Sequence, residues 1–305
     1  MNENTRVDAD KNWSILRKKL LALTQSAPGA HQTAIDGFVL HRQVGNDDPK
    51  PRFYEPVIIV VAQGEKWVRI GEEEHHFGEN LCFVTGVDMP ASSCVMSASR
   101  ERPYLSMSLA LNRSLIADLA SKVPPSSSRN GNLCRGAVVQ NLEPDLLDAF
   151  LRLAELAEKP EQIPVMSGLL LREIHYRLFV SPFGDILRSL NTFGSRGNYI
   201  AQALSWLKDN FKEPLRVEDL AGRMNMAPST FHKHFKDVTT LSPLQYQKRL
   251  RLGEAQRLML SSGCDVTQAA TAVGYESATQ FIREYKRLFG ESPRRDVVRL
   301  QGQIG

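Results

Sequence analysis

Hydrophobic and polar positions follow two different periods along this 305-residue chain. From residue 35 to residue 111 the apolar residues form short β-rich runs that Gly and Pro interrupt. From residue 142 onward they recur at every third or fourth position. The first pattern is typical of a small barrel or sandwich and the second of amphipathic helices, so we expect an α+β chain. The expected strands are residues 37–40, 57–62, 66–70, 81–85, 93–97 and 104–111, with a hairpin turn at Gln63, Gly64 and Glu65.

Helical patterns flank the β-rich part on both sides. Residues 12–25 form an amphipathic pattern before Pro28, and two further helices are predicted to begin at Pro144 and after Pro164. The apolar faces of these last two helices must pack on the barrel, on each other or on a second subunit, and the residues alone leave closure of the N-terminal core and dimerisation open. Residues 123–131 are predicted to form an exposed loop.

The helical C-terminal part contains the same element twice. One set of apolar residues recurs 49 positions later and a second set recurs 50 positions later, so the two copies differ by one residue in their turn. Each copy consists of a short apolar helix, a turn and a second, amphipathic helix, which is the pattern of a helix-turn-helix motif. The first set pairs Val217, Ala221 and Met224 with Val266, Ala270 and Val273, and the second pairs Phe231 and Phe235 with Phe281 and Tyr285.

The outer faces of the two second helices are polar and varied. An isoleucine between a threonine and an arginine is unusual on a merely solvated face, but it suits contact with thymine methyls and guanine edges in a major groove. The predicted linker helix over residues 244–261 would span roughly 27 Å, which approaches the ~34 Å of one DNA turn. The outer faces carry Ser229, His232, Lys233 and Lys236 in the first copy and Thr279, Ile282, Arg283 and Lys286 in the second.

Positive charge is concentrated in the same half of the chain. The net charge of the whole chain is +4 at pH 7. From residue 191 onward 17 Lys and Arg face 11 Asp and Glu, whereas the first 190 residues hold 21 against 23. This asymmetry supports a phosphate-binding surface on the C-terminal part, although a difference of this size can also arise by chance.

The cysteine pattern and hydropathy favour a cytoplasmic protein. Cys82, Cys94, Cys134 and Cys264 form no CxxC pair and have no histidine at metal-ligand spacing, so a reducing compartment fits them. No apolar run approaches the ~20 residues that cross a bilayer, and we expect no membrane partner. Nothing near Cys82 or Cys94 in sequence predicts a lowered thiol pKa.

Five segments of the C-terminal part resemble the DNA-binding domain of the AraC/XylS family of transcriptional regulators. They are residues 231–236 (FHKHFK), 242–246 (SPLQY), 249–252 (RLRL), 274–277 (GYES) and 289–293 (FGESP). The resemblance covers about a hundred residues and implies two helix-turn-helix motifs joined by a linker helix, with promoter or operator DNA and RNA polymerase as partners. Asp296 departs from the family, which usually has a tyrosine there, and this puts the packing of the last helix in doubt.

The same resemblance implies which residues contact DNA. We expect Lys233 and Arg283 to read guanines and Ile282 to contact a thymine methyl. The implied base-reading positions are Ser229, His232, Lys233, Ala278, Thr279, Ile282 and Arg283. The expected phosphate contacts are Lys208, Lys212, Lys236, Lys248, Arg249 and Lys286.

A second resemblance lies in the β-rich part. Residues 54–56 (YEP), 60–64 (VVAQG) with Lys66, 88–90 (DMP) and 102–104 (RPY) are similar to the cupin-type N-terminal domain of one branch of AraC-type regulators. This implies a cupin-like barrel with a helical appendage, a small-molecule effector and dimerisation. The expected organisation is residues 1–140 as the sensor domain, 141–190 as a helical pair, 191–197 as the linker and 198–300 as the DNA-binding domain.

The histidine pattern argues against a metal in the barrel. Metal-binding cupins place two histidines at alternate positions of one strand, whereas His75 and His76 are adjacent and His41 has no partner nearby in sequence. We therefore interpret residues 71–76 as a solvated hairpin tip and expect no cofactor. The cavity of such a barrel either takes a small organic ligand or is filled by its own side chains, with Val57, Ile59 and Val61 or their alternates facing inward. Tyr54, Gln63 and Trp67 are the candidate polar-tipped anchors.

The leading interpretation is a sequence-specific transcriptional regulator without enzymatic activity. Two alternatives belong to other classes. The first is a cupin enzyme or a DNA-repair protein fused to an AraC-like module, which would need inward histidines or a reactive cysteine. The second is an architectural DNA binder without sequence preference, which the varied polar faces of the two reading helices disfavour.

Overall fold

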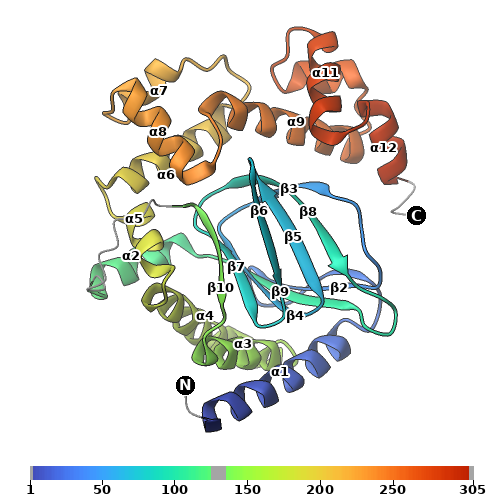
Figure 1. Cartoon of the computed structure of the whole chain (residues 1–305), viewed down its shortest axis with the longest axis vertical. Coiled ribbons are helices and arrows are strands. Elements are labelled where there is room, and N and C mark those ends of the chain that lie inside the picture. The colour runs from blue at the N-terminus through green and yellow to red at the C-terminus, as the bar shows by residue number, and fades with distance from the viewer. Residues whose placement is uncertain (1–2, 125–134, 302–305) are drawn as a thin grey trace.

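The computed structural model describes residues 3–124 and 135–301, and within them ten strands form two antiparallel sheets that face each other as a barrel (Figure 1). The barrel and the C-terminal helices confirm the expected α+β fold. The larger sheet has the order β1 (Gly29–Gln32), β2 (Phe38–Gln43), β9 (Tyr104–Ala110), β4 (Val57–Gln63), β7 (Leu81–Thr85) and β10 (Ala137–Asn141). The smaller sheet has the order β3 (Lys50–Tyr54), β8 (Met89–Ser97), β5 (Glu65–Ile70) and β6 (Glu73–Gly78).

The six predicted strands are present as β2, β4, β5, β7, β8 and β9, and the four unpredicted strands are the outer strands of the two sheets. Outer strands are commonly short and carry charged residues or Pro, which weakens their sequence pattern. β3 contains Pro51, and β6 contains His75 and His76. The interpretation of residues 71–76 as a hairpin tip is therefore wrong beyond Glu72.

The turn at Gly64 joins strands of different sheets. β4 pairs with β7 and β9, whereas β5 pairs with β6 and β8, so the expected hairpin at Gln63, Gly64 and Glu65 is a corner between the two sheets. Gly64 has a φ of 83°, and a Cβ at this position would lie 2.5 Å from the carbonyl oxygen of Ser97. Only glycine fits this corner without displacing the backbone.

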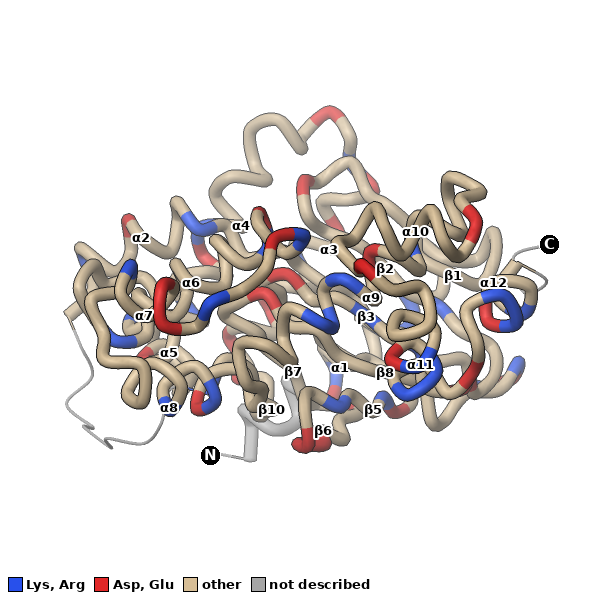
Figure 2. The backbone as a smooth tube through the Cα atoms, turned by 90° about the horizontal axis from the view of Figure 1, so that it is seen from above, with Lys and Arg blue, Asp and Glu red and all other residues tan. Residues whose placement is uncertain are grey.

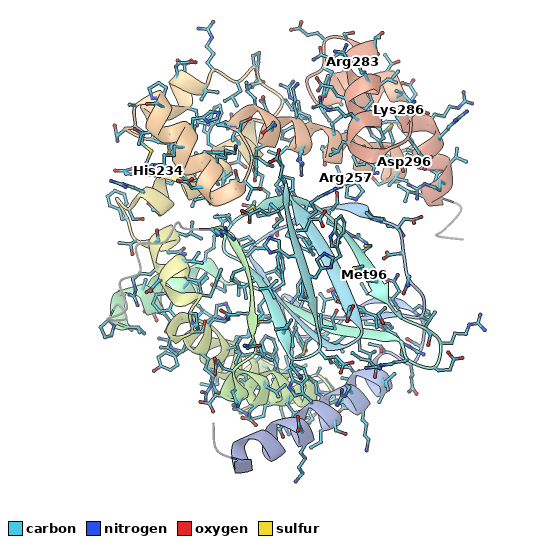
Figure 3. All side chains as sticks on the ribbon, in the orientation of Figure 1. Met96, His234, Arg257, Arg283, Lys286 and Asp296 are labelled. Atoms are coloured by element: carbon cyan, nitrogen blue, oxygen red, sulfur yellow. The ribbon has the colours of Figure 1, made fainter. Side chains whose placement is uncertain are left out.

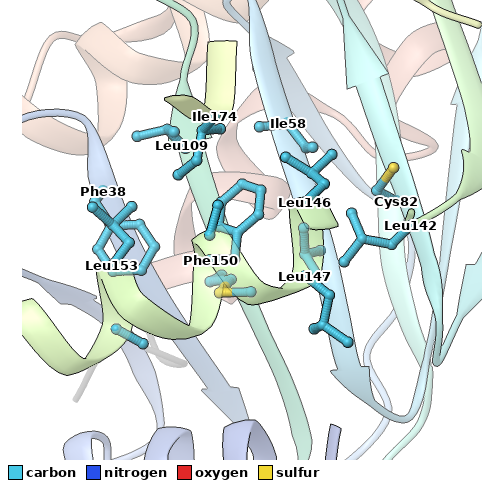
Figure 4. Packing of buried hydrophobic residues seen from close by; sticks show 14 of the residues in the cluster. Phe38, Ile58, Cys82, Leu109, Leu142, Leu146, Leu147, Phe150, Leu153 and Ile174 are labelled. Carbon is cyan, nitrogen blue, oxygen red and sulfur yellow. The ribbon is translucent and has the colours of Figure 1, made fainter. Parts of the chain in front are cut away.

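Helices cover the outer face of the larger sheet: α1 (Glu3–Leu23), α3 (Pro144–Leu156) and α4 (Ile163–Val180), with α2 (Arg113–Lys122) and α5 (Gly184–Asn191) beside them (Figure 1). Leu146 and Phe150 of α3 lie among Ile58 and Leu109 of the sheet (Figure 4). Helix α3 therefore closes the N-terminal core, whereas α4 leaves part of its apolar surface exposed. Residues 125–131 of the predicted loop lie outside the described residues.

The C-terminal helices lie across the barrel from α1 (Figure 1). Two helix-turn-helix units are joined by one long helix, as predicted. The connection between α5 and α6 comprises residues 192–195, so it is shorter than expected. The helices are α6 (Arg196–Asn210), α7 (Val217–Arg223), α8 (Pro228–Thr239), α9 (Pro243–Ser261), α10 (Val266–Ala272), α11 (Ala278–Phe289) and α12 (Pro293–Gln301).

One apolar core runs from the barrel interior into the first helix-turn-helix unit. Ile59 and Phe83 of the barrel belong to the same buried cluster as Leu204, Phe231 and Tyr246 of the helical part. The second unit has a separate cluster. The barrel and the first unit are thus packed as one body.

No helix within residues 3–124 and 135–301 is both long and apolar enough to cross a membrane.

Candidate nucleic-acid interface and barrel cavity

The first helix-turn-helix unit presents α8 at the surface. Asn225 adopts a φ of 53° in the turn after α7, and Pro228 begins α8, where the first turn has amide donors to spare. Phe231 and Phe235 are fully buried beneath the helix. The opposite face leaves Ser229, His232, Lys233 and Lys236 exposed.

The second unit presents α11 in the same way. Gly274 ends the turn with a φ of 87°, where a Cβ would lie 2.2 Å from the carbonyl oxygen of Lys212. Ser277 caps α11, as predicted, because its hydroxyl accepts a hydrogen bond of 3.3 Å from the amide of Gln280. Arg283 and Lys286 lie on the side away from the barrel (Figure 3). Thr279, Ile282, Arg283 and Lys286 are exposed, Ile282 by 40%, whereas Ala278 is half-buried.

Helix α9 holds the two units together. The Arg251 guanidinium donates hydrogen bonds of 2.6 to 3.0 Å to the carbonyls of Phe211, Lys212, Glu213 and Gly274. These contacts join the end of α6 to the turn of the second unit. Helices α8 and α11 therefore have a defined spacing at opposite ends of α9 (Figure 1).

The expected phosphate contacts fall into two groups. Lys212, Lys236 and Lys286 are exposed, and Lys and Arg positions follow α11 in the view from above (Figure 2). The other three have protein surroundings that the sequence did not predict. Lys208 Nζ lies 2.6 Å from Glu55 Oε1 and 3.1 Å from Asp88 Oδ1, and Lys248 Nζ lies 2.8 Å from Glu284 Oε1. Burial and the nearby Arg69 lower the pKa of Arg249. Lys208 and Lys248 are thus ion-paired within the chain, whereas Arg249 is half-buried, and contact of all three with phosphate stays a prediction.

Asp88 is the central residue of the contact between barrel and helices. Its side chain is 3% exposed and binds Lys208 and Arg113, whose Nη2 lies 3.0 Å from Oδ2. The hydroxyl of Tyr246 in α9 donates to the carbonyl of Asp88 at 3.0 Å. The sequence identifies Asp88 only as part of a motif, because Lys208 and Tyr246 lie more than a hundred positions away from it.

The turn after α8 makes a second contact with the barrel. The Thr240 hydroxyl donates to the carbonyl of Ile70 at 2.8 Å, and the amide of Gly136 donates to the carbonyl of Val238 at 2.9 Å. The end of α8 is therefore fixed on the tip of the β5–β6 hairpin. No pattern in the sequence indicated this contact.

Asp296 anchors the last helix, although the family usually has a tyrosine at this position. Its carboxylate accepts hydrogen bonds from Tyr285 Oη at 2.8 Å, Gln256 Nε2 at 2.6 Å and Arg299 Nη2 at 2.5 Å. Asp296 is 1% exposed. The burial of Tyr285, together with its hydrogen bond to the Asp296 carboxylate, raises the pKa of Tyr285. Helices α9, α11 and α12 meet at this single side chain, and the packing of the last helix is no longer in doubt (Figure 3).

The barrel contains a cavity of about 320 Å³. Some strands contribute alternate residues to its walls, as the two-residue period of a strand requires, among them Val57 and Ile59 of β4 and Tyr104, Ser106 and Ser108 of β9. Tyr54, Val57 and Ile59 belong to the lining, and their contact with a ligand stays a prediction. Lys66 also lines the cavity, and the signal for it was its spacing of two and four residues from Val68 and Ile70.

Two predicted pocket residues lie elsewhere. Gln63 donates from Nε2 to the carbonyl of Pro103 at 2.7 Å. The Arg69 guanidinium lies over the Trp67 ring, with Cζ 5.2 Å from the ring centre. Neither residue belongs to the cavity lining. Trp67 directly follows Lys66 on β5, and successive side chains of a strand point to opposite faces, so Trp67 lies outside this cavity.

Histidines and cysteines of the barrel are dispersed. In residues 3–124 and 135–301 no three His, Cys, Asp or Glu side chains are grouped as metal ligands. His41 lies on β2, whereas His75 and His76 lie on β6. Burial raises the pKa of the Cys82 thiol to about 12 and also raises that of Cys94.

A barrel packed on paired helix-turn-helix units defines a two-domain transcriptional regulator. The model of the AraC-type transcriptional regulator N-terminus matches residues 34–186, and a helix-turn-helix domain model matches residues 220–296. The chain belongs to the AraC family of transcriptional regulators.

Individual relatives agree with this assignment. The HTH-type transcriptional activator RhaS of Pectobacterium carotovorum is 29% identical over 147 residues, which cover 47% of this chain and 50% of RhaS. RhaS of Escherichia fergusonii is 36% identical over 91 residues, or 30% of this chain and 33% of that protein. The matches span half or less of these curated relatives. The structure of unsaturated fatty acid bound ToxT from Vibrio cholerae has the same fold, with a TM-score of 0.58, 12% identity and coverage of 88% of this chain and 96% of ToxT.

Proposed function

We propose that the chain binds promoter DNA sequence-specifically by placing α8 and α11 in two successive major grooves. The observation that carries this proposal is that both helices bury their aromatic faces and expose the predicted reading residues other than the half-buried Ala278, at opposite ends of α9. The 19 residues of α9 span roughly 28 Å at the helical rise. With the flanking turns, this length suits grooves about one turn of DNA apart.

Individual residues have distinct roles in this proposal. Lys233 and Arg283 would donate to guanine O6 and N7, and Ile282 would contact a thymine methyl. Ser229, His232, Ala278 and Thr279 would complete the base-reading faces. Lys212, Lys236 and Lys286 would neutralise phosphates, which positions the protein without selecting a sequence.

Selection of binding sites from random duplexes, followed by footprinting with random competitor DNA, tests this function. We expect two protected segments about 10 base pairs apart, because successive major grooves on one side of the duplex recur at this spacing. Arg283→Ala should weaken binding to the selected site by about 1 to 3 kcal/mol and relax the preference at one base pair.

Arg257→Ala is the matched control, because it removes the same charge from the groove between β3 and α9, on the barrel side (Figure 3). This variant should retain both affinity and base preference. An Arg283→Ala protein with an unchanged isotherm and unchanged discrimination among site variants would remove Arg283 from the reading face. Equal protection of random and selected duplexes would instead favour an architectural DNA binder.

We also propose that the chain forms a homodimer through α4. Val165, Leu169, Tyr176 and Val180 are 46% to 73% exposed and lie four, seven and four residues apart, which places them in one stripe. Exposed apolar stripes of this kind mark protein interfaces. Leu169→Glu should shift the chain to monomers in sedimentation velocity, whereas Val298→Glu, an equally exposed position on α12, should not. A monomeric parent protein at micromolar concentration would contradict the dimer.

The barrel is proposed to bind a small-molecule effector, and the DNA-bound protein to contact RNA polymerase. A catalytic role is not proposed, since burial raises the pKa of Cys82 and Cys94 and disfavours the thiolate that a nucleophile requires. Metal analysis of the purified protein tests this. A stoichiometric iron, manganese or zinc content would reopen the cupin-enzyme alternative.

A further inference from the structure

The barrel cavity contains a half-buried cation without an acidic partner. Lys66 points into the cavity from β5, and its Nζ lies 5.6 Å from the centre of the Tyr54 ring. Among the described residues no carboxylate lies within 4.0 Å of the Lys66 ammonium or of the Arg52 guanidinium, which also lines the cavity. Burial alone would lower the pKa of Lys66, but the neighbouring Tyr54 and Tyr104 raise it, so the ammonium stays charged. A cation partly withdrawn from water without a counter-ion favours the arrival of an anion.

The carboxylate in the lining is already engaged. Asp47 Oδ1 accepts a hydrogen bond of 2.6 Å from the amide of Val95, and Oδ2 lies 3.8 Å from Lys50 Nζ. Arg42, at the edge of the lining, donates to the carbonyl of Thr24 at 3.2 Å. Asp47 therefore does not neutralise Lys66, and the interior of the cavity retains a positive charge.

A second, independent feature is the hydroxyl of Tyr104. The residue is 2% exposed and lines the cavity from β9, and its hydroxyl makes no hydrogen bond of 3.5 Å or less in the described structure, with the Ser106 side chain beside it. Buried hydroxyls are nearly always hydrogen-bonded, so an unpaired donor beside Lys66 indicates a missing acceptor.

His41 is affected by the same positive charges in the cavity. Its Nε2 lies 3.0 Å from the Ser108 hydroxyl, and burial, followed by the charges of Lys66 and Arg52, lowers its pKa to about 4. The imidazole is thus neutral at physiological pH and does not compete with Lys66 for an anion. Its position on the cavity wall adds a polar contact for a ligand.

We propose that the barrel binds a small organic carboxylate, with its anionic group between the Lys66 ammonium and the Tyr104 hydroxyl and its apolar part against Val57, Ile59 and Val95. This inference rests on the proposed effector function and names its ligand class. The volume of about 320 Å³ lies at the small end of the range of ligand pockets, which limits the ligand to a short aliphatic or single-ring acid.

Calorimetric titration of the full chain with a panel of carboxylates tests the proposal. The probes are the linear acids from acetate to octanoate together with benzoate, each paired with its neutral primary amide. We expect at least one acid to bind, and its amide to bind at least tenfold more weakly because the ion pair with Lys66 is lost. Absence of binding by every acid, or equal binding of acid and amide, would overturn the proposal.

Two cavity variants separate recognition from structure. Tyr104→Phe should weaken the acid about tenfold and leave the melting temperature of the free protein unchanged, because the hydroxyl makes no bond there. Lys66→Gln should abolish measurable binding without lowering that temperature, whereas Lys18→Gln, an exposed change on α1, should affect neither. A Lys66→Gln protein that binds the acid normally, or that melts earlier, would assign Lys66 a structural role instead.

DNA binding is measured separately by fluorescence anisotropy. The proposal of a carboxylate site and the proposal of a DNA-binding regulator can therefore be rejected independently of each other. Carboxylate binding without any change in DNA affinity or transcription would retain the anion site and reject its effector role. Specific DNA binding by a protein that binds no acid of the panel would retain the regulator and reject the anion site.

Discussion

Asp296 shows how one buried carboxylate can anchor a helix. Its two oxygens accept from donors on α9, α11 and α12. A tyrosine at this position would fill space, but it could not accept these three hydrogen bonds. Tyr285, Gln256 and Arg299 thus form one polar network with Asp296 beneath the second helix-turn-helix unit.

Removal of this carboxylate should destabilise the second unit. We expect Asp296→Ala to lower the free energy of unfolding by about 2 to 3 kcal/mol, because the donors Tyr285 and Gln256 lose their acceptor, whereas Arg299 keeps its ion pair with Glu291. Asp296→Asn retains one acceptor oxygen and should cost only about 1 kcal/mol. Urea denaturation followed by circular dichroism measures both. Equal costs for the two variants would show that packing, and not the hydrogen-bond network, anchors α12.

At the scale of elements, the sequence pattern identified strands according to their burial. β4, β7 and β9 lie inside the larger sheet and have strong apolar runs, so they were predicted almost to the residue. The four missed strands lie at the sheet edges, where polar residues and Pro51 disguise the period. An edge strand is defined by its partner, and no partner is visible in a single sequence.

The helix-turn-helix units were predictable because their signals are local. Helix spacing, Ser277 as a cap and the exposed reading faces all depend on residues within a few positions of one another. The cavity lining combines strands from distant parts of the chain. Which face of β5 points into the cavity decides that Lys66 belongs to the lining and that Trp67 does not. The ion pairs of Lys208 could not be predicted for the same reason, since its acidic partners belong to the barrel.

The β5–β6 hairpin supports the first helix-turn-helix unit through Gly71. A Cβ at Gly71 would lie 2.2 Å from the Thr240 hydroxyl oxygen, which is bonded to Ile70. We expect Gly71→Ala to separate the end of α8 from the barrel and to accelerate protease cleavage in the connection at residues 192–195.

Gly263→Ala is the control for this prediction. Gly263 has a φ of 63°, close to the 62° of Gly71, but a Cβ added to Gly263 would have no neighbouring atom within 4 Å. Both variants therefore bear the same left-handed backbone strain of roughly 1 kcal/mol. Equal cleavage of the two proteins would show that strain, and not the contact with Thr240, determines the effect.

At the scale of the whole molecule, the barrel and the DNA-binding helices share polar contacts as well as an apolar core. Lys208 joins Glu55 and Asp88 on the barrel, and its hydrogen bonds with both raise its pKa although burial alone would lower it. A side chain held in this way cannot also contact DNA phosphate without releasing the barrel. A role of Lys208 in holding the barrel and a role in binding DNA phosphate therefore predict opposite effects on DNA binding when Lys208 is replaced.

Lys208→Met distinguishes them. If Lys208 holds the barrel, this variant should retain its affinity for DNA, and the slope of log K against log salt should stay unchanged. Lys236→Met, at an exposed position on α8, should reduce that slope by about 0.9, because one phosphate contact is lost. Fluorescence anisotropy at several salt concentrations measures both slopes. A reduced slope for Lys208→Met would show that the barrel contact opens on DNA, and it would restore the phosphate role that the sequence predicted.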